Sequence, residues 1–493
     1  MDYNNKALTV SSEAEFSSPE RAQNGPLGTN TESASPYGHL NALQAPSYKG
    51  FGRLGVVSKR YVLQSVIKDV LADVSQDGGR SKFHRFIACK QLSAAFRPSS
   101  PKKGDYQILK RWEDQISIAK VGYSKTEEGK IRGAFTGMCR CDSVWICPVC
   151  QPSIAEYRAL EVRKALYDHK KAGGHIAFVT LTVQHKKSDP LASTLKAVTD
   201  GIKRVKSGKA FQTIKDRHGF IGSIRALEHT FTERNGHHPH LHELWFFESE
   251  VNPTQLKEWI YSRYSKSLKK SGFSCSKLRG VDVKLCLTNK EIDSGRADLD
   301  LSSERSIAAY AAKGINVDQS WEEFSTSGVW GVPEELTKHH LKKPRTYTDG
   351  GTVISYNAMA FALHYMDLTH LLRIVKDEQE RKQITRDLMR FKKLFIEYAE
   401  ATFGRAQLYW SRGLKERFGI YQLDDSEVGE QLESLVVHLN HLSVDDLQKI
   451  VKFRLRPAIM AIVENPEYAD DETRSLKVRE FIDNQSERVM RFG

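Results

Sequence analysis

The chain has 493 residues, more than one hydrophobic core ordinarily organises and enough for two to four domains. Lysine and arginine number 74 against 61 aspartates and glutamates, so the formal charge is +13 and the pI about 9.2, which favours a polyanionic partner such as nucleic acid. No apolar stretch approaches about 18 residues and no basic segment precedes an apolar run near the N-terminus. The sequence therefore predicts neither a membrane span nor a secretory signal, and we expect a cytoplasmic protein.

Composition and pattern divide the chain into five regions. The first is rich in Ser, Asn, Gly, Ala and Pro with few large aliphatic residues, which predicts disorder. We expect a disordered tail (1–50), an N-terminal accessory region (51–135), a cysteine zinc-binding motif with a helix (136–172), a catalytic domain (173–330) and a helical, basic C-terminal domain (331–493).

Helical and strand-like patterns alternate through the middle of the chain. The sequence predicts helices over 57–75, 153–171, 190–206, 253–270, 302–313, 367–403 and much of 425–490, and strands over 176–183, 220–231, 240–247 and 281–287. Asn235-Gly236 between two of these strands predicts a hairpin. This order predicts an α+β fold: an antiparallel sheet covered by helices, preceded by a cysteine knuckle and followed by a mainly helical C-terminal domain.

Seven cysteines are present, and four of them fall within twelve residues in the pattern C-x-C-x₅-C-x₂-C: Cys139, Cys141, Cys147 and Cys150. Such crowding predicts a closed, structural Zn²⁺ site in a reducing compartment. The alternative is a group of buried thiols without metal. The others show no partner pattern and are expected to be core residues: Cys89, Cys275 and Cys286.

Two histidines, His240 and His242, lie two residues apart in an apolar strand. Because side chains alternate along a strand, both imidazoles face one side, about 6.5–7 Å apart. Glu228, on the preceding strand of the hairpin, is the predicted third ligand, and His238 is the alternative. Nitrogen and oxygen ligands with an open position suit Mg²⁺ or Mn²⁺ polarising a phosphate. The alternative is that His240 and His242 are ordinary half-buried histidines that bind no metal.

Tyr310 is a candidate nucleophile in a predicted helix, flanked by small residues that leave room for a substrate. Lys313, three residues on, shares its face and would favour the phenolate over the phenol. The alternative is a tyrosine that packs on the core. Tyr261 and Tyr264 form another pair, but they lie in the helix before the last strand, a less suitable place.

Three further residues are predicted to contact DNA. Thr180 and Thr182 share one face of their strand, where hydroxyls could reach a phosphate or sugar. Arg225 lies in the strand that carries Glu228. The alternative for the threonines is β-branched filling of a strand.

The order of these motifs resembles that of HUH endonucleases: the strand at 178–182, the segment from Arg225 to Glu228 that runs on to 238–242, and Tyr310 with Lys313. The segment 139–150 also resembles the cysteine motif of bacterial plasmid rolling-circle replication initiator (Rep) proteins. The resemblance covers roughly residues 135–320, with a weaker similarity at 409–411.

The resemblance implies a DNA nicking and joining enzyme. In this family, a hairpin at the plasmid origin exposes single-stranded DNA, and a tyrosine cuts it. A 5′-phosphotyrosine link forms, and the 3′-OH primes synthesis by host polymerase and helicase until a second cleavage releases a circular strand. Carried over, His240 and His242 hold the metal, Tyr310 attacks and Lys313 assists. Glu228 as third ligand rests on the hairpin geometry.

One position departs from the family, because some initiators carry a glutamate four residues before the tyrosine, where this chain has Ser306. Glu304 lies off the face of Tyr310 on a helix. Termination would therefore use Glu304 from a non-helical segment, another carboxylate or a second molecule.

Two other functions remain open. A transposase or mobilisation relaxase would share the chemistry, but no second tyrosine lies within four residues of Tyr310, and the cysteine motif favours an initiator. A zinc-containing DNA-binding regulator without activity is the other. Charge places origin recognition in residues 51–135 or in the C-terminal part.

Overall fold

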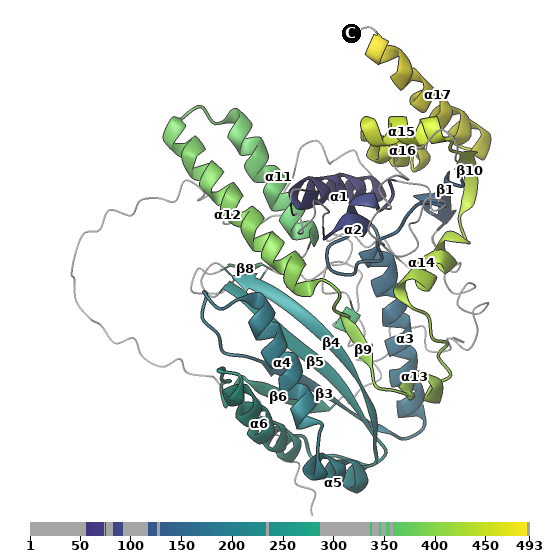
Figure 1. Ribbon diagram of the computed structural model, residues 1–493. Coiled ribbons are helices and arrows are strands. Elements are labelled where there is room, and N and C mark those ends of the chain that lie inside the picture. The colour runs from purple at the N-terminus through teal and green to yellow at the C-terminus, as the bar shows by residue number, and fades with distance from the viewer. Residues whose placement is uncertain are drawn as a thin grey trace, which may run out of the picture. The chain divides into compact units, whose positions relative to one another are not determined.

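The computed structural model describes residues 56–72, 74, 82–91, 117–125, 129–232, 236–285, 336–337, 345–346, 352–354 and 358–490. The helices among them are α1 (Val56–Ala72), α2 (His84–Ala88), α3 (Gln151–Lys171), α4 (Leu191–Val205), α5 (Lys209–His218), α6 (Pro253–Lys270), α11 (Ala358–Ile374), α12 (Glu378–Thr402), α13 (Leu414–Arg417), α14 (Asp425–Glu433), α15 (Val444–Lys452), α16 (Arg456–Val463) and α17 (Asp471–Met490) (Figure 1). The strands are β1 (Lys120–Lys125), β2 (Ile131–Thr136), β3 (His175–Thr182), β4 (Phe220–Thr232), β5 (Gly236–Phe247), β6 (Val281–Leu285), β7 (Arg345–Thr346), β8 (Thr352–Ile354), β9 (Leu408–Trp410) and β10 (Val437–His441).

Seven strands form one antiparallel sheet in the order β6-β3-β5-β4-β8-β7, with β9 also paired to β4. Its centre is the long hairpin of β4 and β5, as the sequence predicts. Three strands, β7, β8 and β9, come from beyond residue 330. The sheet therefore extends past the expected end of the catalytic domain, because these strands of two or three residues carry too little alternation to be seen in the sequence.

One face of the sheet packs against α4 and α6 (Figure 1). Alternate residues of β5, including Leu241 and Trp245, point to this face and are buried with Val179 of β3. The apolar residues of α4 recur every three or four positions, which places them on the one side that meets the sheet: Leu191, Leu195, Val198, Ile202 and Val205. These side chains form an apolar core between the β4–β5 hairpin and helices α4 and α6.

A buried ion pair lies within this core. Glu243 of β5 is fully buried, and its carboxylate accepts hydrogen bonds from Lys206 Nζ at 2.7 Å and Trp245 Nε1 at 2.6 Å. Lys206 also donates to Ser223 Oγ at 2.9 Å. A buried carboxylate is tolerated only with such partners. The network joins the end of α4 to both strands of the hairpin.

The other face of the sheet packs partly against α3 and α13. Leu244 and Phe246 of β5 are buried there with Leu166 of α3 and Leu414 of α13. Helix α3 ends at Lys171, as the sequence predicts, and Gly173 follows it with φ +81°, a conformation that glycine adopts without strain. Helix α3 thus leads directly from the cysteine segment onto the sheet.

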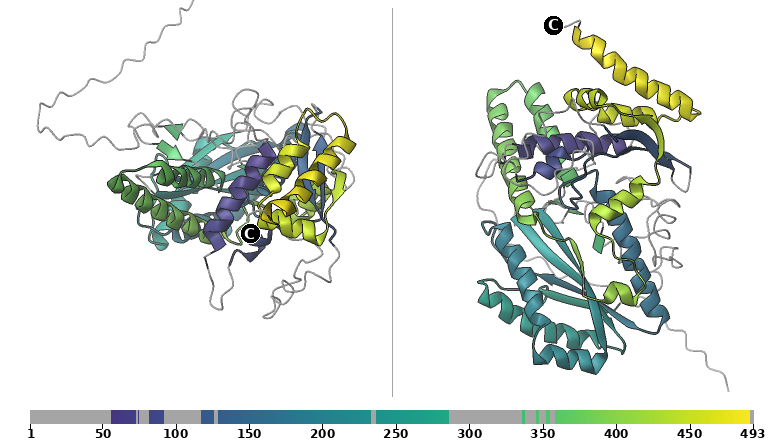
Figure 2. Two further views of the ribbon diagram at one scale, coloured as in Figure 1. Left: turned by 90° about the horizontal axis from the view of Figure 1, so that it is seen from above. Right: turned by 45° about the vertical axis from the view of Figure 1, so that its right-hand side comes forward.

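A second, three-stranded sheet joins distant parts of the chain in the order β10-β1-β2. Strand β1 pairs with β10, more than 300 residues away, with Lys120 opposite His441. Tyr61 of α1 is buried with Ile459 and Met460 of α16, and Figure 2 shows α1 beside the C-terminal helices. The expected accessory region (51–135) and C-terminal domain (331–493) therefore share a sheet and a core.

The coarse fold prediction is confirmed: the chain is α+β, with antiparallel sheets and a largely helical C-terminal part. The helix predicted over 367–403 is two helices, because Asp377 caps α12 by accepting from Glu380 N at 2.8 Å and so ends the preceding helix pattern. The predicted helix over 302–313 and the tail over 1–50 lie outside the described residues. In the part of the chain that is described, no helix is long and apolar enough to cross a membrane.

Candidate metal centres

The two histidines predicted to bind metal lie on one face of β5, beside Glu228 of β4. The strand register puts Glu228 directly across from His240. The distances are 3.4 Å from His240 Nε2 to Glu228 Oε1 and 3.1 Å from His242 Nε2 to Glu228 Oε2. Ligand atoms about 2.1 Å from one ion, at angles of 90–110°, lie about 3.0–3.4 Å apart. These three residues, the histidine–carboxylate group, therefore fit a shared divalent cation.

Burial makes the negative charge of Glu228 costly unless it is compensated. Glu228 is 2% exposed and His242 is buried, whereas the side chain of His240 is 16% exposed. A carboxylate taken out of water needs positive charge or hydrogen-bond donors nearby. The imidazoles supply donors when protonated at Nε2, and a divalent cation would supply charge in their place. The group therefore provides three ligand atoms, and a bound cation would stabilise its buried carboxylate.

Thr180 of β3 orients one of the two imidazoles. It stands directly across from His242, and its Oγ1 lies 3.0 Å from His242 Nδ1. The ring of Phe178 stacks on the same imidazole with centroids 5.2 Å apart. With the proton on Nδ1, His242 would donate to the threonine and leave the lone pair of Nε2 free for a cation shared with Glu228. Thr180, predicted to contact DNA, is therefore placed to position a ligand.

Replacing Thr180 with alanine is expected to weaken Mn²⁺ binding by about 10–100-fold, because the ring of His242 loses the partner that fixes its orientation. Thr180→Ser should restore most of the affinity. The matched control is Thr182→Ala, since Thr182 stands across from His240 but donates to the carbonyl of Arg279 at 3.1 Å. Calorimetric titration with Mn²⁺ measures all three, and equal affinities in the two alanine variants would contradict this role.

His238, the alternative ligand, lies on the same face but outside the group. Its Nδ1 is hydrogen-bonded to His185 Nε2 at 2.8 Å, and its ring centroid is 5.3 Å from that of His240. Burial and the neighbouring His240 and His185 lower the pKa of His238 to about 3, so this imidazole is neutral at physiological pH. His238 is thus a neighbour that is engaged elsewhere.

Arg225 points away from the histidine–carboxylate group. It pairs across the strands with Glu243 and Tyr409, and its guanidinium lies 4.9 Å from the centroid of the Tyr409 ring. Residues an odd number apart on a strand face opposite sides, so Arg225 and Glu228 cannot share a face. The structure does not bring this predicted DNA contact to the candidate site.

The candidate nucleophile cannot be placed here, because Tyr310, Lys313, Ser306 and Glu304 all lie outside the described residues. Tyr264, by contrast, is fully buried in the core between α4 and α6, on the opposite side of the sheet from the histidines. Burial raises the pKa of its phenol well above the usual range. Tyr264 is therefore unsuited to attack a phosphate.

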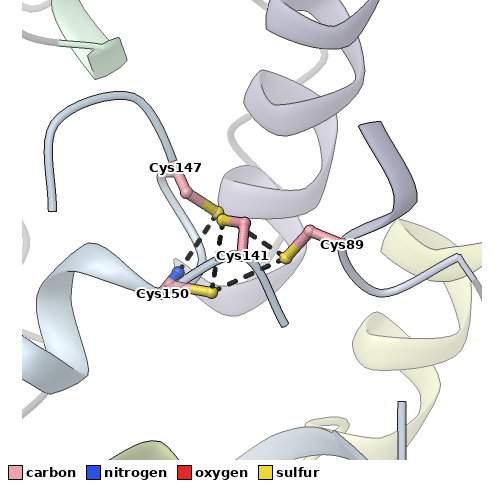
Figure 3. Close-up of side chains that lie close together, drawn as sticks. All are labelled: Cys89, Cys141, Cys147 and Cys150. Carbon is pink, nitrogen blue, oxygen red and sulfur yellow. Dashed lines mark hydrogen bonds between the residues drawn. The ribbon is translucent and has the colours of Figure 1, made fainter. Parts of the chain in front are cut away.

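The second candidate centre consists of four cysteines: Cys89, Cys141, Cys147 and Cys150 (Figure 3). Their sulfurs lie within 4.8 Å of one another. We name these four the cysteine group; it could hold a metal ion such as zinc. Cys139, predicted as a member, is buried but does not join it, and Cys89, expected to be a core residue, takes its place.

Backbone contacts explain how Cys89 reaches the other three. It caps the end of α2, and the next residue, Lys90, donates from its backbone N–H to the carbonyl of Cys139 at 2.7 Å. Cys147 and Cys150 stand where α3 begins, with Cys150 as its N-cap residue. The contact between Lys90 and Cys139 joins segments about 50 residues apart, and no local pattern in the sequence indicates it. Cys89 could therefore not be predicted as a member of the group.

The cysteine group accepts hydrogen bonds from a neighbouring side-chain amide, and its thiols influence one another's pKa. Gln64 Nε2 donates to Cys89 Sγ at 3.4 Å and to Cys147 Sγ at 3.3 Å. The four thiols influence one another: burial raises the pKa of Cys141 and Cys147, whereas hydrogen bonds from Cys141 and Cys147 lower the pKa of Cys150 to about 7. Four thiolates this close repel, so they cannot ionise together without a bound cation.

The chain is similar to a family of proteins and to two known relatives. Residues 131–458 match the model of a family described as "Replication protein" (Rep_1). "Protein rep" of Streptomyces lividans is 34% identical over 330 residues, which cover 58% of this chain and 64% of that protein. "Neomycin resistance protein" of Streptomyces cyanogenus is 29% identical over 134 residues, 22% of this chain and 30% of that protein. This chain therefore spans less than two thirds of either relative. No solved structure matches it.

Proposed function

The chain belongs to the replication protein family that its residues 131–458 match, and on that premise we propose that it initiates rolling-circle replication of a plasmid. The proposed activity is HUH-type nicking of one strand at the origin, followed by rejoining. The observation that carries this proposal is the convergence of Glu228, His240 and His242 on one face of the sheet. A net charge of +13 supports a nucleic-acid substrate.

The histidine–carboxylate group would hold one divalent ion. Two imidazoles among three ligands favour Mn²⁺ over Mg²⁺, which prefers oxygen ligands and retains water. When bound, the ion would withdraw charge from the scissile phosphate and orient it. Glu228 holds the two imidazoles side by side through its two oxygens, and Thr180 fixes the ring of His242. These residues therefore preorganise the group before DNA arrives.

Tyr310 is the proposed nucleophile. Its phenolate oxygen forms a bond to phosphorus while the bond from phosphorus to the 3′ oxygen breaks. The departing oxygen takes up a proton and becomes a 3′-OH, and the 5′ end remains on the tyrosine. Lys313, three residues along the predicted helix, would favour the phenolate. Host polymerase would then extend the 3′-OH while a host helicase unwinds the duplex.

Two regions are proposed for the DNA interface. Thr182 stands across from His240, so it lies where the cut strand would pass. Arg225 lies on the other face with the exposed ring of Tyr409, so a contact from it would reach a different segment of DNA. Origin recognition is assigned to the basic residues of 51–135 and 331–493, whose shared sheet and core make them one surface to test.

The reaction is tested by trapping the covalent product. Purified protein with Mn²⁺ and a single-stranded oligonucleotide spanning the plasmid's origin should give a protein–DNA adduct that survives SDS. Tyr310→Phe should abolish the adduct, because a benzene ring offers no nucleophilic oxygen. A denaturing gel with labelled DNA measures both, and omission of Mn²⁺ should remove the adduct as well.

Tyr264→Phe is the matched control, since it makes the same change at a buried hydroxyl that has no hydrogen-bond partner among the described residues. It should form as much adduct as the unmodified chain. An undiminished adduct in Tyr310→Phe would transfer the role to another residue. Origin binding without any adduct, and unaffected by Mn²⁺, would favour a DNA-binding regulator instead.

A further inference from the structure

We propose that Cys89, Cys141, Cys147 and Cys150 bind one Zn²⁺ in a closed tetrahedral site, and that this ion cross-links the α1–α2 segment to the start of α3. Cys89 lies outside residues 131–458, the part of the chain that matches the family. The ligand that closes the site is therefore one that the family match does not contain. This inference stands independently of the nicking reaction.

The sulfur positions fit a tetrahedron around zinc. The distances from Cys89 Sγ are 3.6 Å to Cys150 Sγ and 3.9 Å to Cys147 Sγ, and Cys141 Sγ lies 3.9 Å from Cys150 Sγ. Four sulfurs about 2.3 Å from one zinc ion stand about 3.8 Å apart. The side chains of Figure 3 point toward one common centre from three separate segments. With four thiolates present, no position is left for substrate, so the site is structural.

The choice between Cys139 and Cys141 follows from the backbone. Of these two cysteines Cys141 joins the group, whereas the carbonyl of Cys139 accepts a hydrogen bond from the N–H of Lys90. The intervening Arg140 bonds through Nε to Asp142 and through Nη1 to Glu433. Cys139 is thereby kept beside the group and outside it, and Cys89 supplies the fourth sulfur.

Donors aimed at sulfur are a second, independent observation. The side-chain amide of Gln64 bridges Cys89 and Cys147, and the backbone N–H of Cys150 lies 3.4 Å from Cys147 Sγ. N–H groups stabilise thiolate ligands far more than neutral thiols, since hydrogen bonds to charged acceptors are stronger. Gln64 is fully buried, so its amide has been taken out of water to serve these sulfurs.

Buried basic side chains lie in the same region. Lys68 and Arg456 are 5% and 2% exposed, and in the described ranges neither forms an ion pair with a carboxylate. Lys68 Nζ donates to the carbonyl of Cys89, and Arg456 donates to the carbonyl of Lys90. A zinc ion with four thiolates carries a net charge of about −2, which basic side chains nearby can offset.

The consequence is a cross-link between segments that are distant in sequence. Cys89 follows α2, whereas Cys147 and Cys150 open α3, the helix that packs on the catalytic sheet. Trp145, inside the same loop, donates from Nε1 to the carbonyl of Arg405 at 2.7 Å and so reaches the end of α12. The ion would therefore hold α1 and α2 where these elements meet.

The test measures zinc and its ligands without DNA. The full chain carrying His240→Ala and His242→Ala is used, so that the histidine–carboxylate group cannot contribute metal. We expect about one zinc per chain by elemental analysis, and four sulfurs at about 2.3 Å by X-ray absorption. Cys89→Ser should lose the fourth sulfur, and Cys139→Ser, the same change at a buried cysteine beside the group, should keep all four.

Three results would overturn the proposal: no zinc in protein purified or refolded with zinc present, three sulfurs in the parent chain, or loss of a sulfur in Cys139→Ser with retention in Cys89→Ser. If Cys89→Ser does not fold, X-ray absorption of Cys139→Ser decides alone. Four sulfurs there support Cys89 as a ligand, and three contradict it. A chain that binds zinc yet fails to nick DNA would leave this inference intact and remove only the proposed activity.

Discussion

Replacing His242 with alanine is expected to lower the rate of origin nicking by at least about a thousandfold. The ring supplies one of three ligand atoms that lie within 4.8 Å of one another. Its loss would leave a carboxylate and one imidazole, too few to hold an ion where a phosphate must be polarised. Removing one preorganised electrostatic contact to a transition state ordinarily costs about 10²–10³-fold, and a lost ion removes more.

The same strand offers a matched control. His238 faces the same side as His240 and His242, is half-buried, and is neutral because partial burial and its neighbours lower its pKa to about 3. His238→Ala removes an equal volume and the bond to His185. It should lower nicking by less than about tenfold, since it takes no ligand from the group.

Single-turnover cleavage of the origin oligonucleotide, with Mn²⁺ varied, compares the two variants. His242→Ala should remain slow at any Mn²⁺ concentration that saturates the unmodified chain, and circular dichroism should show an unchanged fold. If His238→Ala were the slower variant, the ligand set would be Glu228, His240 and His238. If both nicked at the normal rate, the group would have no part in the chemistry.

The histidine–carboxylate group could be predicted because strand geometry is local. Alternation places His240 and His242 on one face from their numbers alone, and a hairpin brings Glu228 across to them. The same rule predicts that Arg225, an odd number of positions from Glu228, lies on the other face of the sheet.

The members of the cysteine group could be predicted only in part from local sequence. The spacing of Cys147 and Cys150 indicates a site, but it cannot say whether Cys139 or Cys141 turns inward, nor that Cys89 closes the group. That choice depends on a single backbone contact, from Lys90 to Cys139, which forms only when the tertiary fold is present. Nothing in the residues around Cys89 distinguishes it from a core cysteine.

Long-range strand pairing was equally beyond the sequence. Strand β10 has five residues and its partner β1 lies more than 300 residues away. Pairing over such a distance depends on the helices that bring both strands into one core, α1 and α15 to α17. Strand β1 of the expected accessory region thus pairs with a strand of the expected C-terminal domain, which composition could not reveal.

Loss of the fourth cysteine is expected to destabilise the region around the zinc site by at least about 3 kcal/mol, because the free energy of metal binding is part of the free energy of folding. Cys89→Ala removes a ligand and leaves three crowded sulfurs beside Lys68 and Arg456. Cys139→Ala removes a buried sulfur of the same size from the segment after β2, beside the group, and should cost only about 1 kcal/mol. The difference between the two variants isolates the metal from the packing.

Hydrogen exchange read by mass spectrometry locates the effect. In Cys89→Ala, and in the unmodified chain after chelation, exchange should rise in α1, α2 and the first turn of α3. It should remain slow in the middle of β5, because Leu241 and Trp245 pack in a core that does not include the cysteine group, and Glu243 is held there by Lys206 and Trp245. Uniform loss of protection would mean that the whole chain unfolds as one unit. Equal exchange in Cys89→Ala and Cys139→Ala would show that no ion links these helices, since a cavity alone would then account for both.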